Sequence, residues 1–184
     1  MQNEILKGKR LHLRAVEPSD IDLLYQWEND PSIWKVSSTL TPYSRFQIEE
    51  YVMNVQNDIY STKQLRLMIV GHNGEIKGKT IGAIDLFDFD PFHLRAGVGI
   101  LIREEFRGNG HAAEALELLI KYAFEILNVR QLYSNIAPIN TASISLFEKY
   151  GFERCGIKKD WIRSGNSWLE EWMFQLIRPA EPVK

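Results

Sequence analysis

The sequence predicts a single domain of the α/β (α+β) class, with a mixed central sheet of about seven strands and four main helices. Three observations predict this class. The chain has 184 residues, enough for one hydrophobic core but too few to expect two. Runs with the period of strands alternate with runs that have the period of helices. Turns rich in glycine and proline separate them. We therefore expect one domain over residues 1–184, with its core from about 11 to 177.

The first third of the chain predicts one strand and two helices. Residues 11–14 alternate apolar and polar side chains, as a half-buried strand does. Ser19 is expected to cap a helix that ends at Asn29-Asp30-Pro31, because the residue before a proline avoids the α region. We expect a loop over residues 34–43 and a second helix over residues 44–58.

The middle of the chain predicts three antiparallel strands in sequence. They cover residues 65–70, 80–89 and 93–102, and each is rich in β-branched or aromatic side chains. Asn73-Gly74 supplies a turn residue suited to positive φ between the first two strands. The third strand leads directly to a glycine-rich turn.

The last part of the chain predicts two helices, one crossover strand and a hairpin. Residues 110–127 have apolar side chains at helical spacing, and residues 131–136 form a strand parallel to 93–102 through a right-handed crossover. Asn140 can cap a helix that runs to Tyr150, and Gly151 suits the left-handed position after it. Strands at 152–162 and 168–177 then form a hairpin around Ser164-Gly165-Asn166.

The turn before the third predicted helix has the composition of a phosphate-binding loop. Gly108 and Gly110 let the main chain approach an anion, and the free N–H groups of a helix N-terminus point at it. The spacing does not match a P-loop. It matches the loose dinucleotide pattern, but no acidic residue near 128–133 could hold a ribose. We therefore expect a phosphate ligand of another kind.

Two motifs in the right order suggest which ligand this is. The sequence Arg107-Gly108-Asn109-Gly110-His111-Ala112 resembles the pyrophosphate loop of the GNAT family of N-acetyltransferases. Residues 135–152 resemble the second motif of that family. The opening of the chain, residues 11–31, is similar to the ribosomal-protein N-acetyltransferase and spermidine (polyamine) acetyltransferase branches. The resemblance covers about residues 11–177.

The resemblance implies direct transfer of acetyl from acetyl-CoA to a primary amine in a ternary complex. It also implies that acetyl-CoA lies where two parallel strands splay apart, here those around Ile100 and Asn135. The residues it assigns to acetyl-CoA are Ile100, Leu101, Ile102, Arg107, Gly108, Asn109, Gly110, His111, Ala112, Asn135, Asn140 and Phe147.

The transfer needs a base that takes a proton from the amine, because an amine with a pKa of about 10.4 is mostly protonated at neutral pH. Asp85 aligns best with an acidic position of the polyamine branch, and Asp88 is the second choice. Asp90 and His93 lie on the same pair of strands. The alternative is that these residues simply belong to a half-exposed strand.

The acid that protonates the departing thiolate is where the sequence differs from the family. Many members have a tyrosine at the position of Phe147. Tyr150 and Ser143 are the alternative donors, and both are therefore catalytic candidates. Tyr150 could instead be a core residue, and Ser143 an ordinary first-turn residue.

Composition excludes several classes of partner. The net charge of -2 gives no basic face for nucleic acid, and no apolar run approaches the length of a membrane span. The four histidines and scattered carboxylates show no metal spacing, so we expect no metal. A single cysteine, Cys155, fits the reducing cytoplasm. The sequence leaves open whether two chains pair as a homodimer.

The sequence therefore predicts an acetyl-CoA-dependent N-acetyltransferase. Its acceptor would be a protein N-terminus, a polyamine or another small amine. Six carboxylates, Glu28, Asp30, Glu49, Glu50, Glu170 and Glu171, could form an acidic mouth that attracts a cation or could be an ordinary solvated surface. The alternative function is a catalytically idle acyl-CoA-binding or regulatory module, and the missing tyrosine at Phe147 is its support.

Overall fold

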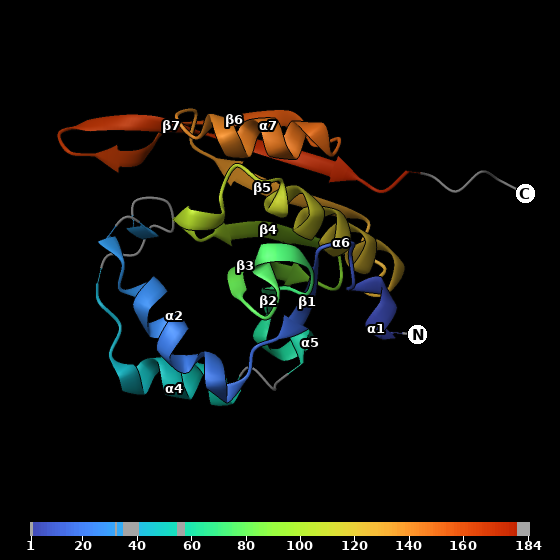
Figure 1. Cartoon of the computed structure of the whole chain (residues 1–184). Helices are drawn as coiled ribbons and strands as arrows, with labels where there is room; N and C mark the ends of the chain where they lie inside the picture. Colours follow the sequence, from blue (N-terminus) through green and yellow to red (C-terminus); the bar gives the residue numbers. More distant parts are fainter. Residues whose placement is uncertain (1, 32, 35–40, 55–57, 180–184) are drawn as a thin grey trace, which may run out of the picture.

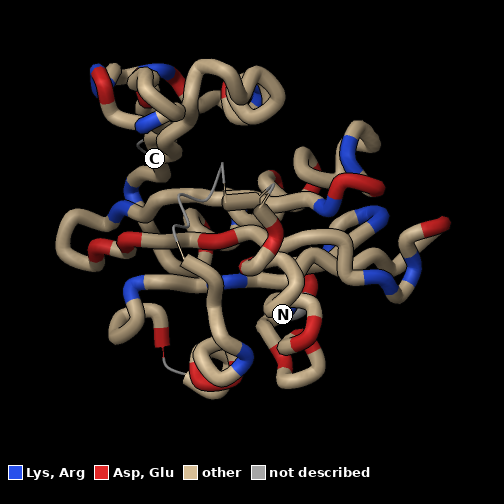
Figure 2. The backbone as a smooth tube through the Cα atoms, turned by 90° about the vertical axis from the view of Figure 1, so that its left-hand side faces the viewer, with Lys and Arg blue, Asp and Glu red and all other residues tan. Residues whose placement is uncertain are grey.

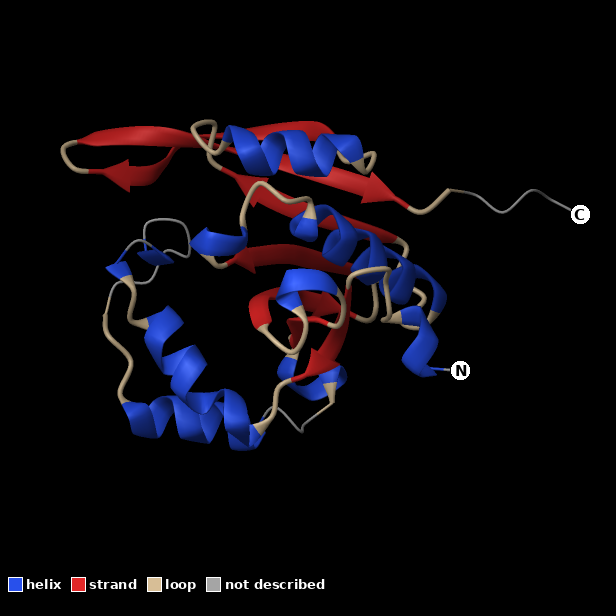
Figure 3. Cartoon of the chain, viewed as in Figure 1, coloured by secondary structure: helices blue, strands red, loops and turns tan. Residues whose placement is uncertain are grey.

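A seven-stranded sheet with helices on both faces forms the body of the computed structural model, which describes residues 2–31, 33–34, 41–54 and 58–179 (Figures 1 and 3). The strand order is β1-β2-β3-β4-β5-β7-β6. The strands are β1 (Leu11–Ala15), β2 (Leu65–Gly71), β3 (Thr80–Asp90), β4 (Arg95–Ile102), β5 (Gln131–Ile136), β6 (Glu153–Ser164) and β7 (Ser167–Ile177). Only β4 and β5 pair in parallel, and every other neighbouring pair is antiparallel. The predicted fold class is confirmed.

The four main helices cover opposite faces of this sheet. They are α2 (Ile21–Glu28), α4 (Arg45–Asn54), α6 (His111–Glu125) and α7 (Thr141–Lys149). Leu116 of α6 and Phe147 of α7 share one core cluster with Ile84 of β3. Ile48 of α4 packs in a second cluster with Ala83 of β3. Because successive strand residues face opposite sides, Ala83 and Ile84 place the two clusters on opposite faces.

The sequence predicted the end signals of α7 correctly. Asn140 Oδ1 accepts a hydrogen bond from Ser143 N at 3.2 Å, so Asn140 is the N-cap. Gly151 follows the helix with φ of 82°, a left-handed conformation that glycine adopts without a steric penalty.

Ser19 is not the cap of the first long helix, so that prediction is wrong. Residues Pro18–Asp20 form a 3-10 turn, and α2 begins only at Ile21. Asp20 stabilises the turn by accepting a hydrogen bond from Glu17 N at 2.9 Å, and Ser19 is exposed. A buried carboxylate with several donors therefore determines the helix start.

The second helix is shorter than predicted. It ends at Asn54, and Asp58, its predicted last residue, is instead the N-cap of the short helix α5 (Ile59–Thr62). Asp58 Oδ1 accepts hydrogen bonds from Tyr60 N and Ser61 N, which is the usual role of aspartate at a helix start. Neither α5 nor the short helix α1 (Gln2–Ile5) was predicted. The predicted loop at 34–43 lies largely outside the described residues.

Replacement of Asp20 by alanine is expected to lower the free energy of unfolding by about 3 kcal/mol at neutral pH, because it leaves a partly buried guanidinium without its partner. Asp20 is 4% exposed, and its oxygens accept hydrogen bonds from Arg14 Nη1 at 2.6 Å and Nη2 at 2.8 Å. Thermal or urea unfolding measures the loss. Asp22→Ala, which removes an exposed carboxylate from the start of α2, is the control and should change little.

The same contact should depend on pH. Burial acts to raise the pKa of Asp20, but the hydrogen bonds from Arg14 and Glu17 outweigh it and hold that pKa below its usual value. The stabilisation is therefore complete above the unfolded pKa of about 4 and is lost as the pH falls through the lower folded pKa. Wild type and Asp20→Ala should converge in stability at that acidic end, and a difference that persists there would contradict this assignment.

Candidate active site

The parallel strands β4 and β5 pair over only part of their length. The ladder joins Arg95 to Gln131, Ala96 to Leu132 and Gly97 to Tyr133, and within these fully described strands it ends there. Beyond it, Ser134 Oγ donates a hydrogen bond to Val98 O at 3.1 Å. β4 then continues to Ile102 and β5 to Ile136 without further pairing to each other, although each stays paired with its other neighbour. This is the splayed parallel pair that the family resemblance implied, and Ile100, Leu101, Ile102 and Asn135 all lie in its unpaired part.

A loop with two left-handed glycines connects β4 to α6. Gly108 and Gly110 have φ of 76° and 75°, and Gly110 is the residue before the first turn of α6. No side chain of the described residues caps this helix. The N–H groups of its first turn are therefore available to a ligand, and the helix dipole favours an anion there. Ala112 lies in that first turn.

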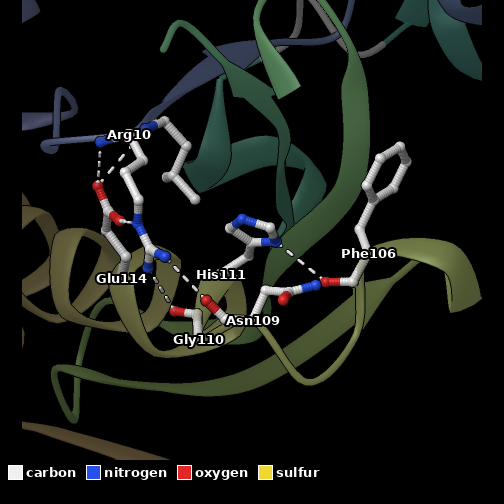
Figure 4. Close-up of polar contacts among 7 residues, drawn as sticks. Arg10, Phe106, Asn109, Gly110, His111 and Glu114 are labelled. Atoms are coloured by element: carbon white, nitrogen blue, oxygen red, sulfur yellow. Dashed lines mark hydrogen bonds and ion pairs between the residues drawn. The ribbon is translucent and has the colours of Figure 1, made fainter. Parts of the chain in front are cut away.

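Side chains of the loop hold its main chain in shape (Figure 4). His111 is 7% exposed, and its Nδ1 lies 3.0 Å from Phe106 O. Asn109 Nδ2 donates to Arg107 O at 3.0 Å, and Arg107 Nε donates to Ile102 O at 2.9 Å. The predicted contact of Arg107 with a phosphate would therefore use its terminal nitrogens.

Asp85 lies on β3 within a network of charged residues. Arg66 Nε donates to Asp85 Oδ1 at 2.7 Å, and Arg66 Nη1 donates to Glu28 Oε1 at 2.7 Å. The Asp85 side chain is 17% exposed. Burial raises the pKa of Asp85, although the Arg66 guanidinium opposes this rise. A carboxylate with a raised pKa accepts a proton more readily than an ordinary one does.

Two glycines of β4 lie on the same face of the sheet as Asp85. In the sheet register Gly99 is opposite Asp85, and Gly97 lies between Phe87 and Tyr133. A Cβ at Gly97 would lie 2.3 Å from the ring of Phe87, so only glycine fits there. Asp85, Phe87, Gly97, Gly99 and Tyr133 therefore lie on one face of the sheet, next to the point where β4 and β5 begin to splay. The alternation of Asp85 with Phe87 and of Gly97 with Gly99 could have predicted this shared face.

Asp88 has different surroundings from Asp85. It is exposed, it has φ of 48° at an irregularity of the β3–β4 ladder, and Tyr133 Oη donates to its Oδ2 at 3.3 Å. Burial and the Asp88 carboxylate raise the pKa of Tyr133 to about 12. The Tyr133 hydroxyl therefore stays protonated at neutral pH. The other two candidate bases are Asp90 and His93. Asp90 accepts hydrogen bonds from the main-chain N–H groups of Phe92 and His93 in a turn.

The candidate proton donors for the thiolate lie on or next to α7. Phe147 is 2% exposed and packs edge-on against Phe152, with ring centroids 4.8 Å apart. Ser143 is half-buried in the first turn of the helix. Tyr150 packs against the larger core cluster, and burial and the negative charge of Glu117 of α6 raise its pKa. Both Tyr150 and Ser143 therefore remain candidates.

Asn135, on the β5 side of the splay, contacts the C-terminal hairpin. Lys158 Nζ of β6 donates to Asn135 Oδ1 at 3.0 Å and to Glu171 Oε2 at 2.7 Å. Glu171, one of the six carboxylates of the predicted acidic mouth, is thus paired, and so is Glu28. Acidic and basic residues are interspersed along the chain (Figure 2).

A pocket of ≈ 380 Å³ lies between α2, α4 and β2. Glu28, Arg66 and Tyr51 line it, so it borders the ionic network that includes Asp85. The Arg66 guanidinium carbon lies 5.6 Å from the ring centroid of Tyr51, which helps to fix the arginine. Sequence reasoning missed Arg66 and Tyr51. A single arginine in the apolar run of β2 was the signal that could have found the first.

The described residues include neither a candidate metal site nor a candidate membrane-spanning helix. No group of three or more His, Cys, Asp or Glu side chains that could hold a metal ion occurs among them. Within the same residues, no helix is both long and apolar enough to cross a membrane.

Comparison with known proteins matches one family model to most of the chain. The acetyltransferase (GNAT) domain model matches residues 10–153. The uncharacterized N-acetyltransferase p20 of Bacillus licheniformis is 29% identical over 177 residues, which cover 95% of this chain and 97% of that protein. The spermidine N(1)-acetyltransferase of Escherichia coli (strain K12) is 28% identical over 140 residues, which cover 76% and 71%.

A solved structure has the same fold. The spermidine N-acetyltransferase from Vibrio cholerae, in complex with CoA and spermine, superimposes with a TM-score of 0.81 over 92% of this chain and 96% of that one, at 23% identity. The family model alone spans most of the chain. The chain therefore belongs to the GNAT acetyltransferase family and is an N-acetyltransferase.

Proposed function

We propose that the enzyme transfers an acetyl group from acetyl-CoA directly to a primary amine held in the same complex. The end of the β4–β5 ladder at Gly97, followed by the loop with Gly108 and Gly110, is the observation that carries this proposal. The unpaired strand edges supply hydrogen-bonding groups for the pantetheine amides, and the loop supplies N–H groups for the diphosphate. Asn135 and Asn140 lie on the other side of the splay.

Asp85 is the proposed base. It takes a proton from the ammonium group, directly or through a water molecule, and the free amine nitrogen then forms a bond to the acetyl carbon. The carbon–sulfur bond breaks, the nitrogen gives up a second proton to water as the neutral amide forms, and the thiolate of CoA receives a proton from Ser143, Tyr150 or water. A thiol has a pKa of about 8.5, so the thiolate leaves without a strong acid. This explains how the reaction proceeds although Phe147 has no hydroxyl.

The proposed acceptor is a polyamine or a protein N-terminus. Glu28 and Asp85 supply two carboxylates for the one guanidinium of Arg66, so this network carries a net negative charge beside the pocket. Such a site favours a cation over a neutral or anionic acceptor. The similarity to spermidine acetyltransferases supports a polyamine.

A CoA-binding module without turnover is the second candidate function. The phenylalanine at position 147, where many family members have tyrosine, favours it.

Release of the CoA thiol distinguishes the two functions. We expect purified protein with acetyl-CoA to release thiol faster when spermidine, an aminoglycoside or a peptide with a free N-terminus is added. The fully N-acetylated form of the same amine, which has no free amino group, is the control and should give only the basal rate. Ser143→Ala and Tyr150→Phe identify the acid, since only its removal should lower kcat. If CoA binds but no amine accelerates thiol release, the module is the correct function.

A further inference from the structure

Arg10, which precedes β1, contacts the glycine-rich loop that connects β4 to α6 (Figure 4). Its Nη1 donates to Asn109 O at 2.8 Å, and its Nη2 donates to Gly110 O at 3.2 Å. Its Nε donates to Glu114 Oε2 at 2.9 Å. One guanidinium therefore connects two consecutive loop carbonyls and a carboxylate of α6. None of these contacts was expected from the sequence.

The carbonyls of Asn109 and Gly110 belong to the peptide units that also contain the N–H groups of Gly110 and His111. These N–H groups are the ones that would contact a bound anion. In a trans peptide the C=O and the following N–H point in opposite directions, and the described chain contains no cis peptide bond. Holding the Asn109 carbonyl toward Arg10 therefore directs the Gly110 N–H away from it. The Gly110 carbonyl fixes the His111 N–H in the same way. These N–H groups belong to the loop proposed to bind the diphosphate.

Glu114 completes this arrangement by fixing the arginine. Its Oε1 accepts a hydrogen bond from Arg10 N at 2.7 Å, so the same carboxylate contacts both the main chain and the side chain of Arg10. Glu114 is 14% exposed. Burial acts to raise its pKa, but the hydrogen bonds from Arg10 outweigh it and lower the pKa below its usual value. Glu114 is thus ionised at neutral pH and holds Arg10 against α6.

We infer that Arg10 is a positioning residue for acetyl-CoA: it orients the peptide units of Asn109 and Gly110 so that the N–H groups of Gly110 and His111 face the diphosphate. The inference rests on the proposed function. Arg10 acts through the main chain of the loop and need not touch the ligand. Its role depends on the two-pronged shape of guanidinium, which can hold two carbonyls and a carboxylate at once.

Calorimetry with CoA and kinetics with two acyl donors test this. We expect Arg10→Ala to raise the Kd for CoA and the KM for acetyl-CoA about tenfold, in the range for losing charged hydrogen bonds. The KM for S-acetylpantetheine, which has no diphosphate, should not change, and neither should the KM for the amine. Arg45→Ala is the matched control, since Arg45 is also an exposed arginine paired with carboxylates, on the distant helix α4.

Arg10→Lys separates geometry from charge. It retains the positive charge but has a single ammonium, so we expect CoA binding to stay at least about threefold weaker than in wild type. Full recovery by lysine, or equal losses for both acyl donors, would overturn the positioning role. If wild type binds CoA and Arg10→Ala binds it equally well, only this inference fails. If wild type does not bind CoA, the proposed function fails with it.

Discussion

Gly110→Trp is expected to weaken CoA binding at least about 100-fold while the chain stays folded. At φ of 75° an L residue is strained by about 1–2 kcal/mol. A Cβ at this position would lie 3.4 Å from Arg10 Nη2, and the indole beyond it would cover the N–H groups at the start of α6. Loss of access to these groups, rather than backbone strain, should dominate. Calorimetry with CoA measures the effect.

Gly78→Trp is the matched control for this substitution. Gly78 has φ of 74°, and a Cβ added there would meet no atom of the surrounding structure within 4 Å, so this variant carries the same backbone strain without covering the loop. Both variants should lose similar stability in thermal unfolding. If Gly110→Trp binds CoA as well as Gly78→Trp does, the loop is not the diphosphate site.

Asp85→Asn is expected to lower kcat about 10²- to 10⁴-fold, the usual range for loss of a general base. Asparagine has the same shape and can still accept a hydrogen bond from Arg66, but it cannot accept the proton of the amine. The KM for acetyl-CoA should not change, because Asp85 lies on β3 and not on the loop. Steady-state kinetics with the best amine from the thiol-release assay measures both constants.

The pH profile separates a base from a structural carboxylate. A base acts in its ionised form, and burial raises the pKa of Asp85, so activity should be lost as the pH falls through that raised pKa. The Asn variant should lack this acid limb. Glu28→Gln removes the other partner of Arg66 and should change the KM for the amine more than kcat. An equal fall in kcat for Glu28→Gln would indicate that the ion-pair network, not proton transfer, matters. A larger loss in Asp88→Asn would move the base to Asp88.

Local signals in the sequence were sufficient for most of the fold. Alternating, β-branched or aromatic runs predicted all seven strands, and helical spacing together with capping and end signals predicted the four main helices. These patterns work because each reflects burial of one face of one element. They fail for Ser19, because the choice of capping residue there depends on a donor from another element, Arg14, which binds Asp20. They also fail for Asp58, which caps the short helix after it instead of ending the helix before it.

The candidate site also has one part that the sequence could predict and one part that it could not. Its loop is a contiguous stretch, so Arg107 to Ala112 could be recognised from residue types and spacing alone. The ionic network is not contiguous, because Glu28, Arg66 and Asp85 come from a helix and two strands. No local pattern connects them.

The sequence by itself therefore determined the strand order along the chain, the glycine-rich loop and the second family motif, because each depends on residues that are neighbours in the chain. Only the tertiary structure decided where the β4–β5 ladder ends, which charges surround Asp85, and that Arg10 holds the carbonyls of Asn109 and Gly110. These contacts join segments as far as 100 residues apart. Their geometry is set by how the sheet and α6 pack, and packing is a property of the whole chain.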